Sequence, residues 1–208
     1  SVMPQVESAD VILSLDSDFL NPAQGNLTNV RAFSARRNPQ QSGNPMNRLY
    51  VAENHFSTTG GMADHRLRIK ASQVTDLALA LEVEVAKSTG DSNLQQVVSS
   101  ARSGNAVFNA DWVRECAADL VAHRGRALVL AGPQQPLQAQ LLVLALNQAL
   151  QSFGSTLAVL ESGQAASGNI TDLAKSMKDG EVKTLFILGG NPAYNAPADL
   201  DFASLLPT

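Results

Sequence analysis

The stretch Val11–Leu15, with the sequence VILSL, decides the fold class because it is a short apolar run between two aspartates. Asp10 precedes this run and Asp16 follows it. A run of this length with apolar residues at nearly every position is typical of a strand buried on both faces of a sheet. Strands of that kind occur mainly in parallel sheets that helices cover on both sides. The stretch therefore predicts an α/β protein.

The rest of the chain alternates between similar strands and stretches with helical spacing, which predicts right-handed crossovers and a mainly parallel sheet. We expect an α/β fold with flanking helices, arranged as two Rossmann-like units at residues 1–90 and 91–208. Ser72 is the expected cap of the helix that follows it, and Asn109 or Asp111 the expected cap of a later one. The predicted strands are residues 11–15, 49–52, 67–69, 127–131, 157–160 and 184–188, and the predicted helices are 28–37, 73–87, 94–101, 111–124, 137–153, 170–178 and 200–206.

The composition argues against several classes of function. The 208 residues carry a formal net charge of −4, and 44% are hydrophobic while 16% are charged. This balance supports a buried core and argues against a nucleic-acid partner, which requires clustered Lys and Arg. No apolar run is long enough to predict a membrane span. The single cysteine, Cys116, cannot form an internal disulfide or hold an iron–sulfur cluster, so a buried structural thiol is expected. The abrupt start and end of the sequence suggest a piece of a larger chain.

Polar or glycine-rich segments follow the predicted strands directly, at the edge where parallel sheets bind ligands. These segments are residues 16–18, 53–55, 132–135 and 189–192. The segment 189–192 is the strongest local signal, because two glycines allow close backbone approach and Asn191 offers both a donor and an acceptor. A tight turn after a strand explains the same residues. Gly132 likewise opens either a plain turn before a helix or an anion site at the helix start.

Catalytic and metal-binding patterns are weak. His55, His65 and His123 lack the spacing of a metal site, so a structural or solvated role is predicted for each, with no metal and no catalytic residue. The basic stretch at residues 65–70 alternates charged and apolar side chains, which is typical of a half-exposed edge strand. The same stretch could instead bind phosphate or the carboxylates of a partner.

The order of these motifs resembles the molybdopterin oxidoreductase family, the dimethyl-sulfoxide-reductase class. The most specific resemblance is to the family pattern GxIKxLxxxGxNP, which residues 180–192 follow up to Gly189, Gly190, Asn191 and Pro192. The resemblance covers most of the chain in the family's order, and its other matching segments are residues 9–13, 31–37, 50–53, 63–70, 77–81 and 131–135.

The departures from the family pattern concern groups that approach the pterin nucleotide. Residues 71–74 read Ala-Ser-Gln-Val where the family has Pro-Gly-Thr-Asp, and residues 53–55 read Glu-Asn-His where it has Asp-Pro-Arg. Each buried polar group of a ligand that loses its partner costs about 1–3 kcal/mol. The resemblance therefore implies the family's fold with no cofactor expected in this chain.

This pattern of losses is similar to one branch of the family, the molybdopterin-like iron–sulfur subunit of alternative complex III, a quinol:electron acceptor oxidoreductase. Residues 46–53 and 58–67 carry that resemblance. It implies a non-catalytic scaffold in a respiratory electron-transfer complex, with iron–sulfur, haem and membrane subunits as partners. It also implies a place on the periplasmic face of the bacterial inner membrane, reached by export as part of a larger chain.

Two alternatives stay open. The first is an active oxidoreductase that binds molybdopterin guanine dinucleotide, and the second is a generic nucleotide-binding α/β module. If a pterin nucleotide binds, the resemblance assigns the cofactor contacts to Gly189, Gly190, Asn191, Pro192, Glu53, Asn54, Ser72 and Gly132.

Overall fold

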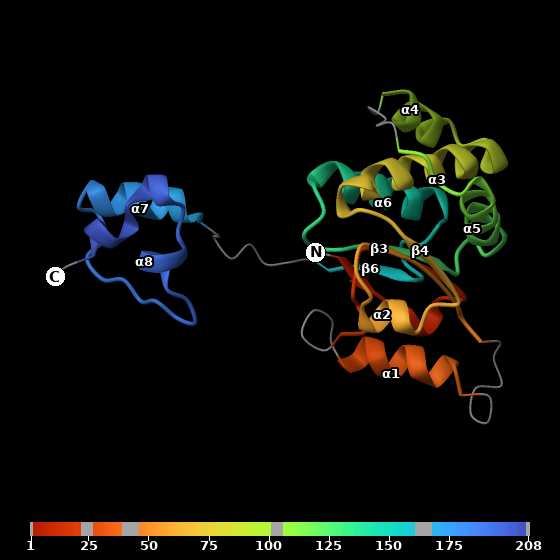
Figure 1. Cartoon of the computed structure of the whole chain (residues 1–208), viewed down its shortest axis with the longest axis horizontal. Helices are drawn as coiled ribbons and strands as arrows, with labels where there is room; N and C mark the ends of the chain where they lie inside the picture. Colours follow the sequence, from red (N-terminus) through yellow and green to blue (C-terminus); the bar gives the residue numbers. More distant parts are fainter. Residues whose placement is uncertain (1, 22–26, 39–45, 101–105, 161–167, 207–208) are drawn as a thin grey trace. The chain divides into compact units, whose positions relative to one another are not determined.

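The computed structural model of the chain describes residues 2–21, 27–38, 46–100, 106–160 and 168–206. Contacts divide the chain into two compact units, Ser1–Leu160 and Glu161–Thr208, which we call the first and the second unit. All strands of the described residues belong to the first unit, and the second unit contains helices and turns (Figure 1).

The elements have the following bounds. The first unit contains β1 (Val2–Pro4), η1 (Val6–Ser8), β2 (Val11–Leu15), α1 (Leu27–Arg36), β3 (Arg48–Glu53), α2 (Thr58–Gly61), β4 (His65–Arg68), η2 (Ala71–Gln73), α3 (Val74–Thr89), α4 (Ser92–Ser100), α5 (Ala110–Ala122), β5 (Ala127–Ala131), α6 (Leu137–Ala149) and β6 (Leu157–Val159). The second unit contains α7 (Ile170–Lys178), α8 (Pro192–Asn195), η3 (Ala198–Leu200) and η4 (Phe202–Leu205).

The centre of the first unit is a four-stranded sheet in the order β4-β3-β2-β5, and all of its pairs are parallel. All five residues of β2 are buried, as the apolar run predicts. The α/β class and the parallel sheet are therefore confirmed. Asn109 caps α5 as predicted, since its side chain accepts a hydrogen bond from the Trp112 amide at 3.0 Å.

Helices cover both faces of this sheet. The side chains of β2 alternate between these faces and so contribute to two cores. Val11, Leu13 and Leu15 belong to a core that they share with α3, α5 and α6. Ile12 belongs to a second core with Phe33 of α1. Figure 1 shows the corresponding layers, with α3, α4, α5 and α6 on one side of the sheet and α1 and α2 on the other. In the described part of the chain, no helix has both the length and the apolar character that a membrane crossing requires.

The observed division differs from the expected boundary after residue 90. β5 pairs with β2 along its whole length, so a cut at that position would split one sheet. β6 does not extend this sheet and instead pairs antiparallel with β1. Ser72 is not the cap of α3, because the chain forms the short helix η2 first and Gln73 takes the cap position.

Two predictions for the second unit are wrong. The apolar run at 184–188 forms no strand, and Phe186 and Leu188 remain 81% and 90% exposed. The described part of the second unit contains no strand with which the run could pair. The helix expected at 200–206 is replaced by η3 and η4, since Asp201 between them has a φ of 44° that interrupts a right-handed helix. The predicted helix at 94–101 corresponds to α4, and Ala101 lies outside the described residues.

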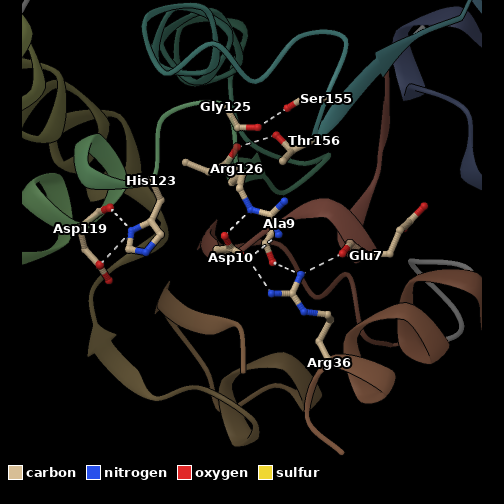
Figure 2. A network of polar contacts seen from close by, with 11 residues as sticks. Glu7, Ala9, Asp10, Arg36, Asp119, His123, Gly125, Arg126, Ser155 and Thr156 are labelled. Atoms are coloured by element: carbon tan, nitrogen blue, oxygen red, sulfur yellow. Dashed lines mark hydrogen bonds and ion pairs between the residues drawn. The ribbon is translucent and has the colours of Figure 1, made fainter. Parts of the chain in front are cut away.

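A network around Asp10 fixes the amino end of β2 (Figure 2). The Arg36 guanidinium at the end of α1 lies 2.5 Å from the Asp10 carboxylate, and Arg126, which precedes β5, contacts both oxygens of the same group. Arg36 also donates to the carbonyls of Glu7 and Ala9. The hydrogen bond from Arg126 lowers the pKa of Asp10 most, and together with Arg36 it outweighs burial and brings that pKa to about 2. One carboxylate therefore connects α1, β2 and the start of β5.

Side chains cover the outer edge of β5, where the sheet ends. The buried Asn147 side chain of α6 accepts from the Val129 amide at 3.0 Å and donates to the Val129 carbonyl at 2.8 Å. The hydroxyls of Ser152 and Thr156 donate to the Ala127 carbonyl at 2.8 Å and 2.5 Å. These four bonds satisfy backbone groups that would otherwise require a neighbouring strand.

Replacement of Asn147 tests this edge. Asn147→Ala leaves the buried amide and carbonyl of Val129 without partners, so we expect the free energy of unfolding to fall by about 2–4 kcal/mol. Urea unfolding followed by circular dichroism measures the change. The matched control is Gln148→Ala, an exposed neighbour on α6 that should alter stability by less than about 0.5 kcal/mol. Equal unfolding midpoints for the two variants would contradict the role of Asn147.

Candidate functional site

Three of the predicted polar segments meet at the carboxyl edge of the sheet. The register places Leu15 beside Ala52 on one side and Ala131 on the other, so residues 16–18, 53–55 and 132–135 lie together. Between them is a hollow of about 60 Å³, which we call the carboxyl-edge hollow. Its lining residues are Asp16, Ser17, Asp18, Glu53, Asn54, His55, Ser57, Pro133 and Gln134.

Gly132 is needed for backbone packing at this edge. Its amide donates to the Leu15 carbonyl at 2.9 Å, and a Cβ at this position would lie 1.9 Å from the Asp16 carbonyl oxygen. Asp16 has a φ of 52°, and its carboxylate accepts from the Gln135 side chain at 2.7 Å. The turn after β2 and the turn after β5 are therefore locked together, and Gly132 provides the space for this contact.

Asp18 connects the segment 16–18, which follows β2, to α2. Its carboxylate accepts from the backbone amide of Thr59 at 2.8 Å and from the Thr59 hydroxyl at 2.7 Å. Burial raises the pKa of Asp18, but the hydrogen bonds from Thr59 outweigh this effect and hold the pKa below its ordinary value. Asn21 donates to the other carboxyl oxygen at 3.1 Å. Asp18 is therefore an ionised acceptor that is already occupied by the protein.

Glu53 is likewise bonded within the protein. It is 2% exposed and accepts from the Ser57 hydroxyl at 2.5 Å and from the Arg66 Nε at 2.6 Å. Gly60 lies directly against it, since a Cβ there would be 1.8 Å from Glu53 Oε1. The glutamate that the resemblance assigns to the cofactor thus holds α2 and β4 in place.

Asn54 and His55 are the exposed polar side chains of the β3 tip. Asn54 Oδ1 lies 2.6 Å from His55 Nδ1, and both residues line the carboxyl-edge hollow. This pair is the accessible part of the β3 segment, and it offers an amide and an imidazole to a small polar ligand.

A larger hollow of about 550 Å³ lies beside the end of β4, and we call it the β4 hollow. Arg68 and Lys70 provide its charge, and both are exposed. An anion would be favoured there, because the hollow adjoins the start of η2 and α3. Ser72 is exposed but does not line it. The lining residues are Asn54, Arg68, Ile69, Lys70, Ala71 and Gln73.

The fourth predicted segment, Gly189–Pro192, belongs to the second unit and follows no strand there. Gly189 has a φ of 71° and Gly190 has open space around its Cα. The Asn191 carbonyl accepts from the amides of Tyr194 and Asn195, and Pro192 begins α8. The segment therefore forms a turn before a one-turn helix, although the strand expected before it is absent from the described second unit.

The remaining candidate residues have structural partners. Among the described residues, no group of His, Cys, Asp and Glu is arranged to hold a metal ion. His65 stacks on Tyr50 with ring centres 4.6 Å apart, and His123 contacts the carbonyl of Asp119 at 2.8 Å. Burial raises the pKa of the Cys116 thiol well above its ordinary value, so this cysteine is the inert thiol that the helical pattern predicts.

The sequence interpretation did not pair the acidic groups of this edge with the residues that bind them. Ser57 caps α2 and bonds Glu53, Thr59 binds Asp18, and Gln135 binds Asp16. A cap signal was present at Ser57, which is followed by a threonine pair and two glycines. No sequence signal pairs Thr59 with Asp18, because 41 residues separate them.

In comparisons with known proteins, no family model and no curated protein sequence matches the chain. The resemblance in motif order therefore stays a prediction.

The close contact at Gly132 gives a direct test of the edge. In Gly132→Ala the new methyl group meets the Asp16 carbonyl, so the two turns must separate and we expect a loss of about 1–3 kcal/mol in the free energy of unfolding. Gly61→Ala is the control, because its methyl group would make only an ordinary contact at 3.6 Å with Phe56. Chemical denaturation of both variants measures the difference, and an undisturbed Gly132→Ala would disprove the tight contact.

Proposed function

We propose that this chain is a scaffold part of a molybdopterin-oxidoreductase-like subunit in a respiratory electron-transfer complex, and that its carboxyl edge holds no pterin nucleotide. Its role is to pack against the iron–sulfur, haem and membrane partners of that complex on the periplasmic face of the inner membrane. The proposal combines the motif order of the sequence with the chemistry of the carboxyl edge.

The observation that carries the proposal is the pairing of the acidic groups at this edge. Asp16, Asp18 and Glu53 accept hydrogen bonds from Gln135, Thr59, Ser57 and Arg66. A polar ligand would have to replace these bonds, and a buried group left without a partner costs about 1–3 kcal/mol. A negatively charged nucleotide would also meet three carboxylates, which repel it.

The size of the carboxyl-edge hollow supports the same reading. Sites for small molecules usually enclose about 300–1,000 Å³. The carboxyl-edge hollow has about 60 Å³, well below that range. The residues present at this edge do not fit a pterin dinucleotide, and we derive no chemical step through that cofactor.

The alternative, a domain that binds molybdopterin guanine dinucleotide, is favoured by the β4 hollow. Its volume of about 550 Å³ is within the range of ligand sites, and Arg68 and Lys70 could neutralise a diphosphate. The same features would serve a generic nucleotide-binding module. Binding at the β4 hollow would therefore support either of these functions, and the scaffold function does not require it.

Titration with GDP separates these functions. We expect no saturable change in Tm up to about 1 mM GDP, whereas a site with a Kd of about 10 μM would stabilise the chain by about 2.7 kcal/mol under those conditions. Molybdenum and pterin are then measured in the native complex that contains the full-length subunit, where we expect neither in stoichiometric amount.

Two outcomes would contradict the scaffold function. The first is a GDP-dependent rise in Tm that Arg68→Ala abolishes and Arg124→Ala retains, since Arg124 is an exposed arginine outside both hollows. The second is stoichiometric molybdenum with pterin in the native complex.

A further inference from the structure

Glu82 is a buried acid that the proposed function does not use. It lies in the middle of α3 with an exposed fraction of 0%. Among the described residues, neither of its carboxyl oxygens has a hydrogen-bond partner. Buried carboxylates are normally paired, because an isolated buried charge is very costly. Glu82 therefore requires an explanation other than an ion pair.

The helical spacing shows which neighbours cover Glu82. Ala80 and Glu84 line a hollow together with Val113 and Arg114, so this side of α3 faces α5. Glu82 lies about 160° around the helix axis from both Ala80 and Glu84. It therefore points away from α5, and the other long helices that pack against α3 are α4 and α6.

The helices on that side have no ionisable side chain. Neither α4 nor α6 contains Asp, Glu, Lys, Arg or His, and η2 contains none. Asp91, directly before α4, accepts from the amides of Asn93 and Leu94. The ionisable residues of α5 are Asp111, Arg114, Glu115, Cys116 and Asp119, and the others of α3 are Asp76, Glu84 and Lys87.

The charged groups of α5 are engaged elsewhere. Arg114 pairs with Asp111 and Glu115 on the exposed surface, and Asp119 binds Arg48 and Tyr50. Among the described residues, a charged Glu82 would therefore have no counterion, and hydration is the way we infer for it to be stabilised.

α4 is the element that could admit this water. It has nine residues, and Leu94 is its only buried side chain. Gly90, with a φ of 67°, ends α3 and separates the two helices. α6, in contrast, carries six buried residues and also holds the edge of β5 through Asn147. Separation of α4 from the rest of the first unit thus exposes much less apolar surface than separation of α6.

We propose that ionisation of Glu82 releases α4 from α3 and α6, so that loss of one proton opens the helical face of the first unit. In the closed state Glu82 is neutral and α4 covers it. In the open state Glu82 is charged and hydrated, and Leu94 of α4 has left the core.

The direction of the pH dependence follows from the pKa of Glu82. Burial raises this pKa from 4.5 to about 8 in the closed state, and hydration restores the ordinary value in the open state. Between these two values the closed state binds the extra proton, so a rise in pH favours opening. From pH 6 to pH 9 the opening equilibrium increases by about 90-fold, and it then becomes constant because both states have lost the proton.

Hydrogen exchange of the first unit tests this proposal. After correction for intrinsic exchange rates, the protection of the α4 amides should fall between pH 6 and pH 9 by a factor approaching this 90-fold change. The α5 amides should keep their protection. In Glu82→Gln, which cannot ionise, the protection of α4 should be independent of pH. Glu84→Gln, a partly exposed acid of the same helix that pairs with Lys87, should behave as the unaltered chain.

Three outcomes would overturn the proposal. They are α4 protection that does not change with pH, a pH response that persists in Glu82→Gln, and an equal loss of protection in α5, which would indicate unfolding of the whole unit. If Glu82→Gln does not fold, Glu82→Met serves as the non-ionisable variant with similar volume.

Discussion

β2 is hydrogen-bonded to a strand on each side and packed against a core on each face. Its one polar side chain, Ser14, is satisfied locally by the carbonyl of Ser17 at 2.6 Å. Charged groups are therefore confined to the two ends of the strand. At the amino end, Asp10 binds arginines from α1 and from the segment before β5. At the carboxyl end, Asp16 is locked against the turn at Gly132. The strand that holds the two cores together thus also sets the position of the candidate site.

The fold of the first unit could largely be predicted, because its central strands β2 and β3 are almost wholly buried and its helices have apolar faces. Apolar periodicity indicates such elements directly, and the run at 127–131 matches β5. Apolar periodicity does not indicate which neighbouring strand a predicted strand pairs with. The run at 184–188 is as apolar as β2 but forms no strand in the described second unit. The pairing of β6 with β1 was also missed, because the N-terminal residues carry no strong strand pattern.

The candidate site was predicted in position and only partly in chemistry. The carboxyl ends of parallel strands lie at the same edge of a sheet, so residues 16–18, 53–55 and 132–135 could be grouped from topology alone. Whether their side chains face a ligand or each other depends on contacts between distant segments. Glu53 is the clearest case, since the sequence presents it as a free acid after a strand. Its burial against Gly60, Ser57 and Arg66 depends on a loop and a strand that follow it.

Asn147 has a consequence for how copies of the protein meet. An uncovered edge strand offers a row of amides and carbonyls on which another chain can add a strand, and this is a common start of aggregation. The side chain of Asn147, with Ser152 and Thr156, occupies the Val129 amide and the carbonyls of Val129 and Ala127 on β5. The other edge of the described sheet is β4, where the exposed guanidinium of Arg68 disfavours the pairing of two such edges. The buried side-chain amide of Asn147 therefore hinders the addition of a further strand to β5.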